Sequence, residues 1–320
     1  MNAIESCGAY VPRYRIDASE FAEAWGSFQA RGVSEKAVSE SDEDAVTMAV
    51  EAIESALATS EYSRDEVGAL AMGTTTPPVD EGDVAAQVAE IIGMRRSVEL
   101  STHTQSTRAG TAALTDAIES RVSPAIAVAA DCPSGAPDSA IDHASGAGAV
   151  AVLIAEDGPV TIEESASYTQ EFPGTRFRQR GQVNVESYDA TAFERDAYTS
   201  VIAGAVDALD RPGTALAPTA PDGSMPYRAG RAVAADMDVY ERTSSLGDTG
   251  AASSLFGLLA AWQEGEDDVV VVGYGDGASA TAIRLDGSVD VDWTRETRSI
   301  TYDEYLRRRG HVVSENGGVN

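Results

Sequence analysis

The sequence predicts an α/β protein made of two similar halves. Short apolar segments alternate with amphipathic helical segments, which is the pattern of a largely parallel sheet covered by helices. The second half repeats this alternation in sparser form, and the repetition indicates an internal duplication. The chain has 320 residues, 43% of them hydrophobic, so it is long enough to bury a large core.

The elements of the first half follow one another at short intervals. In the first helix Ala45, Met48 and Ala52 recur at helical spacing, which gives that helix one apolar face. We assign residues 1–160 to this N-terminal half. The predicted order is a helix over 43–60, a strand over 67–73, a helix over 84–92, a strand over 97–100, a helix from about 107, and paired strands over 125–130 and 148–155.

The second half, residues 161–287, carries corresponding segments. An insertion at 171–189 has no clean period and is predicted to be a long surface loop. It contains Pro173, Gly174, Gly181, Arg176, Arg178 and Arg180. The predicted elements are helices over 192–209, 227–234 and 249–263 and strands over 215–218, 269–274 and 280–284.

A tail over residues 288–320 follows the second half. Its aromatic residues argue against disorder, except at 314–320, which we expect to be disordered.

Acidic residues dominate the charge of the chain. The 52 Asp and Glu residues against 23 Lys and Arg residues give a net charge of −29, and Lys36 is the only lysine. Solvated carboxylates keep a protein soluble where salt screens ordinary repulsion, so this composition indicates a salt-loving host. The one dense basic cluster, Arg307, Arg308 and Arg309, is too short for phosphate recognition, which excludes nucleic acid as a partner.

Other classes of protein are excluded on similar grounds. The chain has no apolar stretch of 18 residues and no signal-peptide pattern at its start, so we expect a cytoplasmic protein that does not associate with membranes. Cys7 and Cys132 are the only cysteines, and three histidines accompany them. These numbers predict neither a disulfide framework nor a metal site.

Seven short motifs, taken in order, resemble the archaeal 3-hydroxy-3-methylglutaryl-CoA synthase branch of the thiolase superfamily. The resemblance covers about residues 2–285. It implies a thiolase fold, a five-layer αβαβα arrangement of two duplicated halves, usually dimeric, with a cleft for CoA thioesters between them. A CoA thioester is therefore the implied ligand, and no cofactor is required. The motifs lie at 8–16, 42–44, 108–111, 134–137, 145–148, 221–223 and 274–277.

The resemblance also implies four chemical positions, and this chain departs from the family at each. In the family a cysteine takes up the acyl group, a glutamate acts as acid and base, and a histidine and an asparagine polarise thioester oxygens. These positions fall, in that order, on Thr107, Thr75, Thr219 and Asp248.

Each replacement removes a different chemical capacity. The Thr107 hydroxyl gains little nucleophilicity at a helix start without an adjacent base. Thr75 cannot act as a carboxylate base, and Thr219 cannot become cationic near neutral pH. An ionised Asp248 would repel an oxyanion, where the loss of one hydrogen-bond donor alone costs about a hundredfold in rate. We therefore expect a catalytically silent site.

Cys132, which follows the strand over 125–130, is the alternative nucleophile, and His143 could support it. The competing interpretation is that Cys132 is a small buried residue and His143 a structural one. Ser106 and Thr107 have a structural explanation too, as caps of the helix that follows.

The tail leaves two interpretations open. Residues 301–310 are similar to a Tyr-x-x-Tyr-Leu-x-x-Arg segment that follows the thiolase fold in synthase-like proteins associated with an OB-fold, zinc-ribbon partner. A strap that packs on its own domain is the alternative.

The leading hypothesis is a silent synthase-like subunit that organises CoA thioester transfer, as a homodimer or as a hetero-oligomer with a thiolase and an OB-fold, zinc-ribbon protein. Two alternatives stay open. One is a condensing acyltransferase, of the synthase or ketoacyl synthase III type, that uses non-standard residues. The other is a protein that binds CoA thioesters without reaction.

Overall fold

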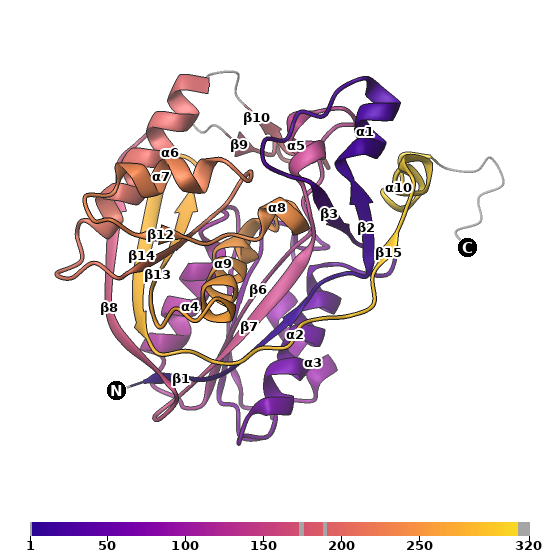
Figure 1. Ribbon diagram of the computed structural model, residues 1–320. Helices are drawn as coiled ribbons and strands as arrows, with labels where there is room; N and C mark the ends of the chain where they lie inside the picture. The colour runs from indigo at the N-terminus through magenta and orange to yellow at the C-terminus, as the bar shows by residue number, and fades with distance from the viewer. Residues whose placement is uncertain (1, 173–175, 188–190, 313–320) are drawn as a thin grey trace.

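A ten-stranded sheet runs through the computed structural model, which describes residues 2–172, 176–187 and 191–312 (Figure 1). The strands lie in the order β12-β11-β13-β14-β8-β1-β7-β6-β4-β5. Their bounds are β1 Ala3–Tyr10, β4 Ala69–Gly73, β5 Glu99–His103, β6 Ala125–Asp131, β7 Gly148–Ala155, β8 Val160–Thr169, β11 Ala215–Pro218, β12 Asp238–Val239, β13 Asp268–Gly275 and β14 Ser279–Asp286.

The two halves of this sheet repeat one strand order. In the first half, β6 lies between the parallel strand β4 and the antiparallel strand β7. In the second half, β13 lies in the same way between β11 and β14. The halves join where β1 pairs with β8, through Ala3 with Thr161 and Ile4 with Val160. The duplication predicted from the sequence is therefore confirmed.

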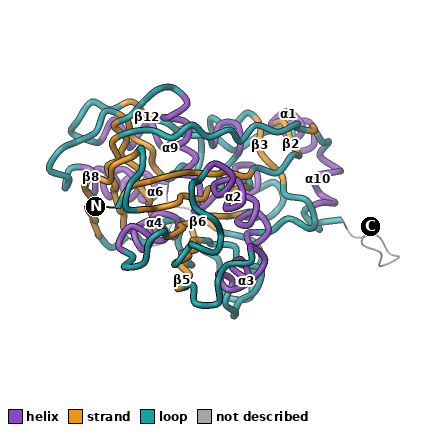
Figure 2. Tube along the Cα trace, turned by 90° about the horizontal axis from the view of Figure 1, so that it is seen from below, coloured by secondary structure: helices purple, strands orange, loops and turns teal. Residues whose placement is uncertain are grey.

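Helices, drawn in purple in Figure 2, form three further layers around the two halves of the sheet. One pair, α2 and α3, covers the outer face of the first half, and α6 and α7 cover the outer face of the second half, while α4 and α9 lie between the halves. The helix bounds are α2 Ala45–Thr59, α3 Val84–Ile92, α4 Ala109–Glu119, α6 Thr191–Val206, α7 Met225–Ala232 and α9 Ser253–Gln263.

Strand β6 shows how the sequence produces these layers. Ala127 and Ala129 belong to the central core with α4 and α9, whereas Ile126 and Val128 pack with α2 and α3. Successive side chains of a strand point to opposite faces, so an apolar strand buried on both sides needs a helix layer on each. The predicted five-layer αβαβα arrangement is confirmed.

Helix α4 approaches the segment that precedes α9 closely at a glycine. A Cβ atom at Gly110 of α4 would lie 2.0 Å from the carbonyl oxygen of Ala251, which belongs to the short helix η1 (Gly250–Ala252) before α9. Only a residue without a side chain permits this contact between the halves.

Local signals fix the helix ends. Asp44 accepts from the amide of Thr47, while the Thr47 hydroxyl accepts from the amide of Asp44, which is a capping box at the start of α2. Helix α3 begins after Asp83 and ends at Gly93, whose φ of 78° suits glycine. Both helices agree with the predicted ranges to within two residues.

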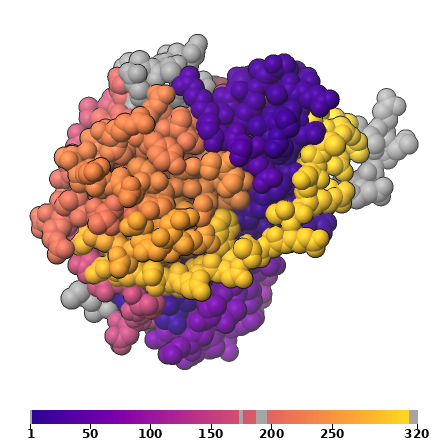
Figure 3. All heavy atoms as spheres, viewed as in Figure 1, coloured from indigo at the N-terminus to yellow at the C-terminus, as the bar shows by residue number. Residues whose placement is uncertain are grey.

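A smaller layer of elements covers one end of the molecule, and the tail packs into it. Strand β15 of the tail pairs with β2, which pairs with β3. Helix α10 packs on α1, and Tyr305 of α10 is 1% exposed. Figure 3 shows the tail crossing the second half to reach the N-terminal segment. The bounds are α1 Ala18–Trp25, β2 Tyr14–Asp17, β3 Glu35–Val38, α5 Ala140–Ala144, β15 Arg298–Ser299 and α10 Tyr302–Arg308.

The tail is therefore a strap on its own chain, which was one of the two predicted interpretations. Its aromatic side chains are used in that packing: the Tyr302 ring lies 5.2 Å from the ring of Phe21. The predicted disordered segment, 314–320, lies outside the described residues.

The remaining differences from prediction lie at element ends and in unassigned segments. Strand β5 is shifted from the predicted 97–100, and α4 begins two residues after the predicted start at 107. The central strands β1 and β8 were not predicted. The insertion at 171–189 carries two short strands, β9 (Arg176–Phe177) and β10 (Glu186–Ser187), while 173–175 and 188–189 lie outside the described residues. Within the described part of the chain, no helix is long and apolar enough to cross a membrane.

Candidate functional site

The candidate site is built around the buried carboxylate of Asp131, at the end of β6 and 0% exposed. Its Oδ1 accepts from the hydroxyls of Thr74 and Thr76, both at 2.8 Å, and from the amides of Thr75 at 2.7 Å and Thr76 at 2.9 Å. Its Oδ2 accepts from the Thr75 hydroxyl at 2.8 Å and the Ala251 amide at 2.7 Å. Because Ala251 belongs to the second half, this carboxylate ties the two halves together at the centre.

A glycine makes room for this contact. A Cβ atom at Gly250 would lie 2.1 Å from Asp131 Oδ2, and the φ of Gly250 is +56°. The amide of Ala251 can therefore reach the carboxylate only because the preceding residue has no side chain.

Thr75, the position predicted for the acid and base, faces Asp131. Its hydroxyl and its amide both donate to that carboxylate, and its carbonyl oxygen accepts from the Arg178 guanidinium at 2.7 Å. The side chain is thus engaged as a donor and has no titratable group to offer a substrate.

Thr107, the position predicted for the nucleophile, is 7% exposed. Its hydroxyl donates to the carbonyl oxygen of Tyr274 at 2.7 Å. It does not cap α4, so that predicted role is wrong: the helix begins at Ala109, and it is the Ser106 hydroxyl that accepts from the amide of Arg108, at 3.2 Å. In the described chain, no carboxylate or imidazole is hydrogen-bonded to this hydroxyl to activate it.

Thr219, the position predicted for the histidine, links two strands of the second half. It is 3% exposed, accepts from the amide of Tyr274 at 2.9 Å and donates to the carbonyl oxygen of Val272 at 3.4 Å. The Thr219 hydroxyl therefore stabilises the backbone of β13.

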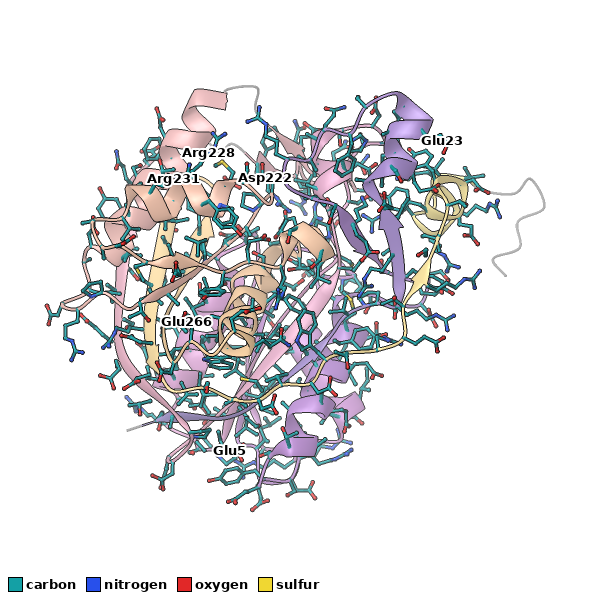
Figure 4. All side chains as sticks on the ribbon, in the orientation of Figure 1. Glu5, Glu23, Asp222, Arg228, Arg231 and Glu266 are labelled. Carbon is teal, nitrogen blue, oxygen red and sulfur yellow. The ribbon has the colours of Figure 1, made fainter. Side chains whose placement is uncertain are left out.

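In the turn that follows, Asp222 accepts from the amides of Ser224 and Met225, both at 2.7 Å, at the start of α7 (Figure 4).

Asp248, the position predicted for the asparagine, is 2% exposed and forms an ion pair with the guanidinium of Arg176. Its Oδ1 accepts from the amide of Gly250 at 2.8 Å. Its backbone is held by α5 and the residues after it: the Asp248 amide donates to Ala144 at 2.6 Å, and its carbonyl oxygen accepts from Gly146 at 2.9 Å. A cation from the insertion thus neutralises this buried carboxylate.

The ion pair changes the interpretation of the insertion. Arg176 was predicted to lie in a surface loop, yet its side chain is only 16% exposed. The insertion is also fixed by the amide of Val185, which donates to the carbonyl oxygen of Ser134 at 2.7 Å. Residues 176–187 therefore lie over the site rather than away from it.

Beside these contacts lies a pocket of about 290 Å³ that combines parts of both halves. Thr75 and Thr107 line it together, whereas Thr219 and Asp248 do not. The insertion supplies two arginines and two apolar side chains to its wall, and one of these arginines, Arg176, pairs with Asp248. The full lining is Thr75, Gln105, Ser106, Thr107, Arg176, Phe177, Arg178, Val185 and Asp276.

The alternative nucleophile, Cys132, lies outside this pocket's lining. Its thiol is 3.8 Å from the Thr76 hydroxyl, and burial raises its pKa even though Arg309 acts in the opposite direction. His143 does not support it: its ring stacks on Phe28 with centroids 5.1 Å apart, and its Nδ1 accepts from the amide of Gln29 at 2.9 Å. A thiol held protonated is a poor nucleophile.

Sequence reasoning missed Asp131 and Arg176, which organise the site. The signals were present: Asp131 follows the last residue of an apolar strand, and three arginines at alternate positions of the insertion are unusual in so acidic a chain. No group of three or more His, Cys, Asp or Glu side chains within residues 2–172, 176–187 and 191–312 could hold a metal ion.

The whole chain is similar to several known proteins. No family model matches the chain. The hydroxymethylglutaryl-CoA synthase of Methanopyrus kandleri is 29% identical, over 96% of this chain and 93% of the relative. The synthase of Archaeoglobus fulgidus is 28% identical, over 98% of this chain and 99% of the relative.

Solved structures agree with this result at the level of the fold. An HMG-CoA synthase complexed with CoA aligns with a TM-score of 0.82 at 13% identity, over 96% of this chain and 90% of the other. The 3-oxoacyl-[acyl-carrier-protein] synthase III of Aquifex aeolicus aligns with a TM-score of 0.77 at 16% identity, over 89% and 100%. The chain is therefore homologous to archaeal hydroxymethylglutaryl-CoA synthases and has the thiolase-like fold that its motifs predicted.

Proposed function

We propose that the chain is a catalytically silent, synthase-like subunit that organises acyl-CoA transfer for active partners. The observation that carries this proposal is the ion pair between Arg176 and Asp248. A condensing enzyme needs hydrogen-bond donors aimed at a developing oxyanion. Here that position holds a carboxylate, and the nearest guanidinium is engaged in neutralising it.

The nucleophile position supports the same proposal. Covalent acyl transfer requires a nucleophile with a base beside it. The Thr107 hydroxyl donates to a backbone carbonyl oxygen, and the Thr75 hydroxyl donates to Asp131. Neither side chain can take up the proton that an attacking group must lose.

Acylation is the direct test. The purified protein is incubated with acetyl-CoA in molar potassium chloride and its intact mass is measured. We expect no adduct. The Thr107→Cys variant is the matched control, since a thiol in the pocket wall gives the acyl group a place to attach. An adduct on the unmodified chain that disappears in Thr107→Ala would contradict catalytic silence.

A condensing acyltransferase that uses non-standard residues is the second candidate. The full-length similarity to synthases favours it, and so does a pocket of about 290 Å³ beside Thr107. This candidate predicts release of CoA from acetyl-CoA and acetoacetyl-CoA. An adduct lost in Cys132→Ser would assign the chemistry to Cys132 instead.

Binding of a CoA thioester without reaction is the third candidate and is compatible with the first. The pocket is large enough for a small acyl group and the adjoining end of the pantetheine arm, with hydroxyl, amide and guanidinium donors in its wall. Equilibrium binding of acetyl-CoA with no thiol released would support this interpretation. Absence of binding would restrict the chain to protein contacts.

For the partner surface we propose the edge of the sheet at β5. This strand ends the strand order, and Leu100 within it is 37% exposed. Beside it, a groove of about 200 Å³ is lined in part by Leu70 and Asp116. A second copy of this chain can add its own edge strand there, and a related thiolase subunit can take the same place.

Sedimentation in molar potassium chloride tests the dimer. We expect a dimer that becomes monomeric in Leu100→Arg and is unchanged in Val183→Arg, whose side chain is 76% exposed on the insertion. A monomeric wild-type protein would contradict this interface. Stoichiometric co-purification of a thiolase and an OB-fold, zinc-ribbon protein would support the larger assembly.

A further inference from the structure

Lys36, the only lysine of the chain, lies in the interior, where a charged group is unfavourable. Lys36 belongs to β3 and is 2% exposed. Burying a charged group costs free energy unless partners compensate for the lost water. A chain that uses arginine for every other basic residue therefore keeps its one lysine in the interior.

The contacts of Lys36 come from three elements, α1, α5 and α10. Its Nζ lies 4.6 Å from the ring centre of Phe21 in α1 and 4.5 Å from that of Tyr305 in α10. The same ammonium donates to the carbonyl oxygen of Asp142 in α5 and to the Tyr305 hydroxyl at 3.1 Å. The Tyr305 hydroxyl in turn donates to the Asp142 carboxylate, whose Oδ2 is buried with no hydrogen bond.

Lysine suits this place because it can lose its charge. Burial lowers the pKa of Lys36 to about 7, with Asp142 opposing the shift and Arg309 adding to it. His143, next to Asp142, is another titratable group nearby, and burial lowers its pKa as well. An arginine would stay charged at every accessible pH and would not fit as a point charge between two rings.

The contacts of α5 lead from Lys36 to the candidate site. Helix α5 has five residues, with Asp142 at its centre and Ala144 at its end. The carbonyl oxygen of Ala144 accepts from the amide of Asp248, and Ser145 forms an isolated bridge with Asp248. A displacement of so short a helix would therefore move the backbone that holds Asp248 against Arg176.

We propose that Lys36, Asp142 and Tyr305 form a clamp that holds α10 on α5 and thereby positions Asp248, and that protonation of Lys36 loosens this clamp. Lys36 acts through α5 and is a positioning residue. The proposal adds regulation to the site of the proposed function.

Linkage gives the sign of the pH dependence. When α10 leaves, water reaches Lys36 and its pKa returns toward the ordinary value of about 10.4. The released state then binds the proton more tightly than the docked state, whose Lys36 pKa is about 7. Docking weakens as the pH falls from about 10 to about 7, by up to tenfold per unit, and changes little below that.

The first experiment observes Lys36 directly. Because the chain has one lysine, labelling with ¹⁵N- and ¹³C-lysine gives a single side-chain resonance. We expect this resonance to titrate near pH 7 in the folded protein in molar potassium chloride. In Tyr305→Phe, which removes the hydroxyl shared by Lys36 and Asp142, the midpoint should change while the fold is kept. An ordinary lysine midpoint in the folded protein overturns the clamp.

The second experiment measures the coupling. Backbone amide exchange, corrected for the intrinsic rate, is followed from pH 9 to pH 6 in α10 and at Gly146, Asp248 and Gly250. We expect both sets of amides to lose protection in parallel as the pH falls, and this pH dependence to disappear in Lys36→Met. Loosening of α10 without any change at Asp248, or no response in either set, contradicts the proposal.

Arg308→Gln is the matched control. Arg308 pairs with Glu40 and stacks over the ring of Tyr14 at 3.6 Å, so its loss weakens α10 docking without touching Lys36. Protection of α10 should fall by a similar factor at every pH. Amide exchange needs neither a thioester nor a partner, so failure of the proposed function leaves this test intact.

Discussion

Among the residues that the structure describes, two carboxylates are 0% exposed, and their surroundings differ. Asp131, at the centre, is surrounded by neutral donors from three consecutive threonines and from Ala251. The carboxylate of Asp142, under the tail, accepts from the Tyr305 hydroxyl, while the Lys36 ammonium donates to the backbone carbonyl oxygen of the same residue. Among the described residues, Oδ2 of Asp142 has no hydrogen-bond partner.

The two carboxylates differ in whether the groups around them gain or lose a proton near neutral pH. The neutral donors around Asp131 do not titrate between pH 5 and 9, so this region is a fixed joint between the two halves. The partner of Asp142 gains or loses its charge within that range, so the contact between tail and body responds to pH. The same chain thus has one rigid junction and one adjustable one.

The largest effect is expected at the rigid junction. Asp131→Asn replaces a carboxylate oxygen by an amide that also donates, which leaves several buried hydroxyl and amide donors without an acceptor. We expect a loss of about 3 kcal/mol or more in the free energy of unfolding, measured by urea denaturation in molar potassium chloride. Asp157→Asn, at an exposed site, is the control. A loss at Asp131 no larger than the control's would remove the distinction between the two carboxylates.

The next effect tests the adjustable contact through stability. The pKa of Lys36 is about 7 in the folded state and about 10.4 in the unfolded state, so the unfolded chain binds more protons between these values. The free energy of unfolding of the wild type should therefore rise with pH, relative to Lys36→Met, by up to about 1.4 kcal/mol per unit from about pH 7 to 10. Parallel curves for the two proteins would show that Lys36 does not titrate in this range.

A third prediction concerns the ion pair that joins the insertion to the site. Arg176→Ala leaves Asp248 buried without its cation, and we expect a loss of roughly 2 kcal/mol in the free energy of unfolding. Asp248→Asn in the same background should recover most of it, because the charge that needed a partner is gone. A double-mutant cycle measures the coupling, and additive losses would mean that the two groups do not stabilise each other.

The smallest loss of stability is expected at an exposed ion pair, which serves as the reference for the other substitutions. Arg96 and Glu90 lie within 2.5 Å, but their side chains are 88% and 65% exposed. Arg96→Ala should leave stability unchanged within error at molar salt, since water and ions screen such pairs. A measurable loss there would indicate that part of the effect of any arginine substitution is generic.

The sequence predicted the layers well because they depend on local patterns. Strand 148–155 and helix 84–92 were predicted to the residue, since apolar runs, the Asp83 cap and the Gly93 ending are all local signals. Strands β1 and β8 were missed. After its first residue, β8 alternates partly buried and exposed residues, several of them polar, as an edge strand would. It lies in the middle of the sheet only because it pairs with β1 on one side and β14 on the other.

The candidate site was predictable in position but not in its contacts. Thr75 and Thr107 were placed from motif order, and they do line one pocket. The partners of Asp248 could not be foreseen, because Arg176 lies 72 residues away in a segment without a regular pattern. Which of three nearby arginines turns inward depends on tertiary packing, which periodicity does not contain.

The single buried lysine also determines how this protein reacts with chemical reagents. Amine-directed cross-linkers and acylating labels rely on exposed lysines, and the folded surface of this chain presents none. Such reagents will report few contacts for it even inside a large assembly, so carboxylate-directed chemistry is the appropriate choice. Slow labelling of Lys36 itself would measure the rate at which α10 detaches, because each labelled molecule gains the mass of one label.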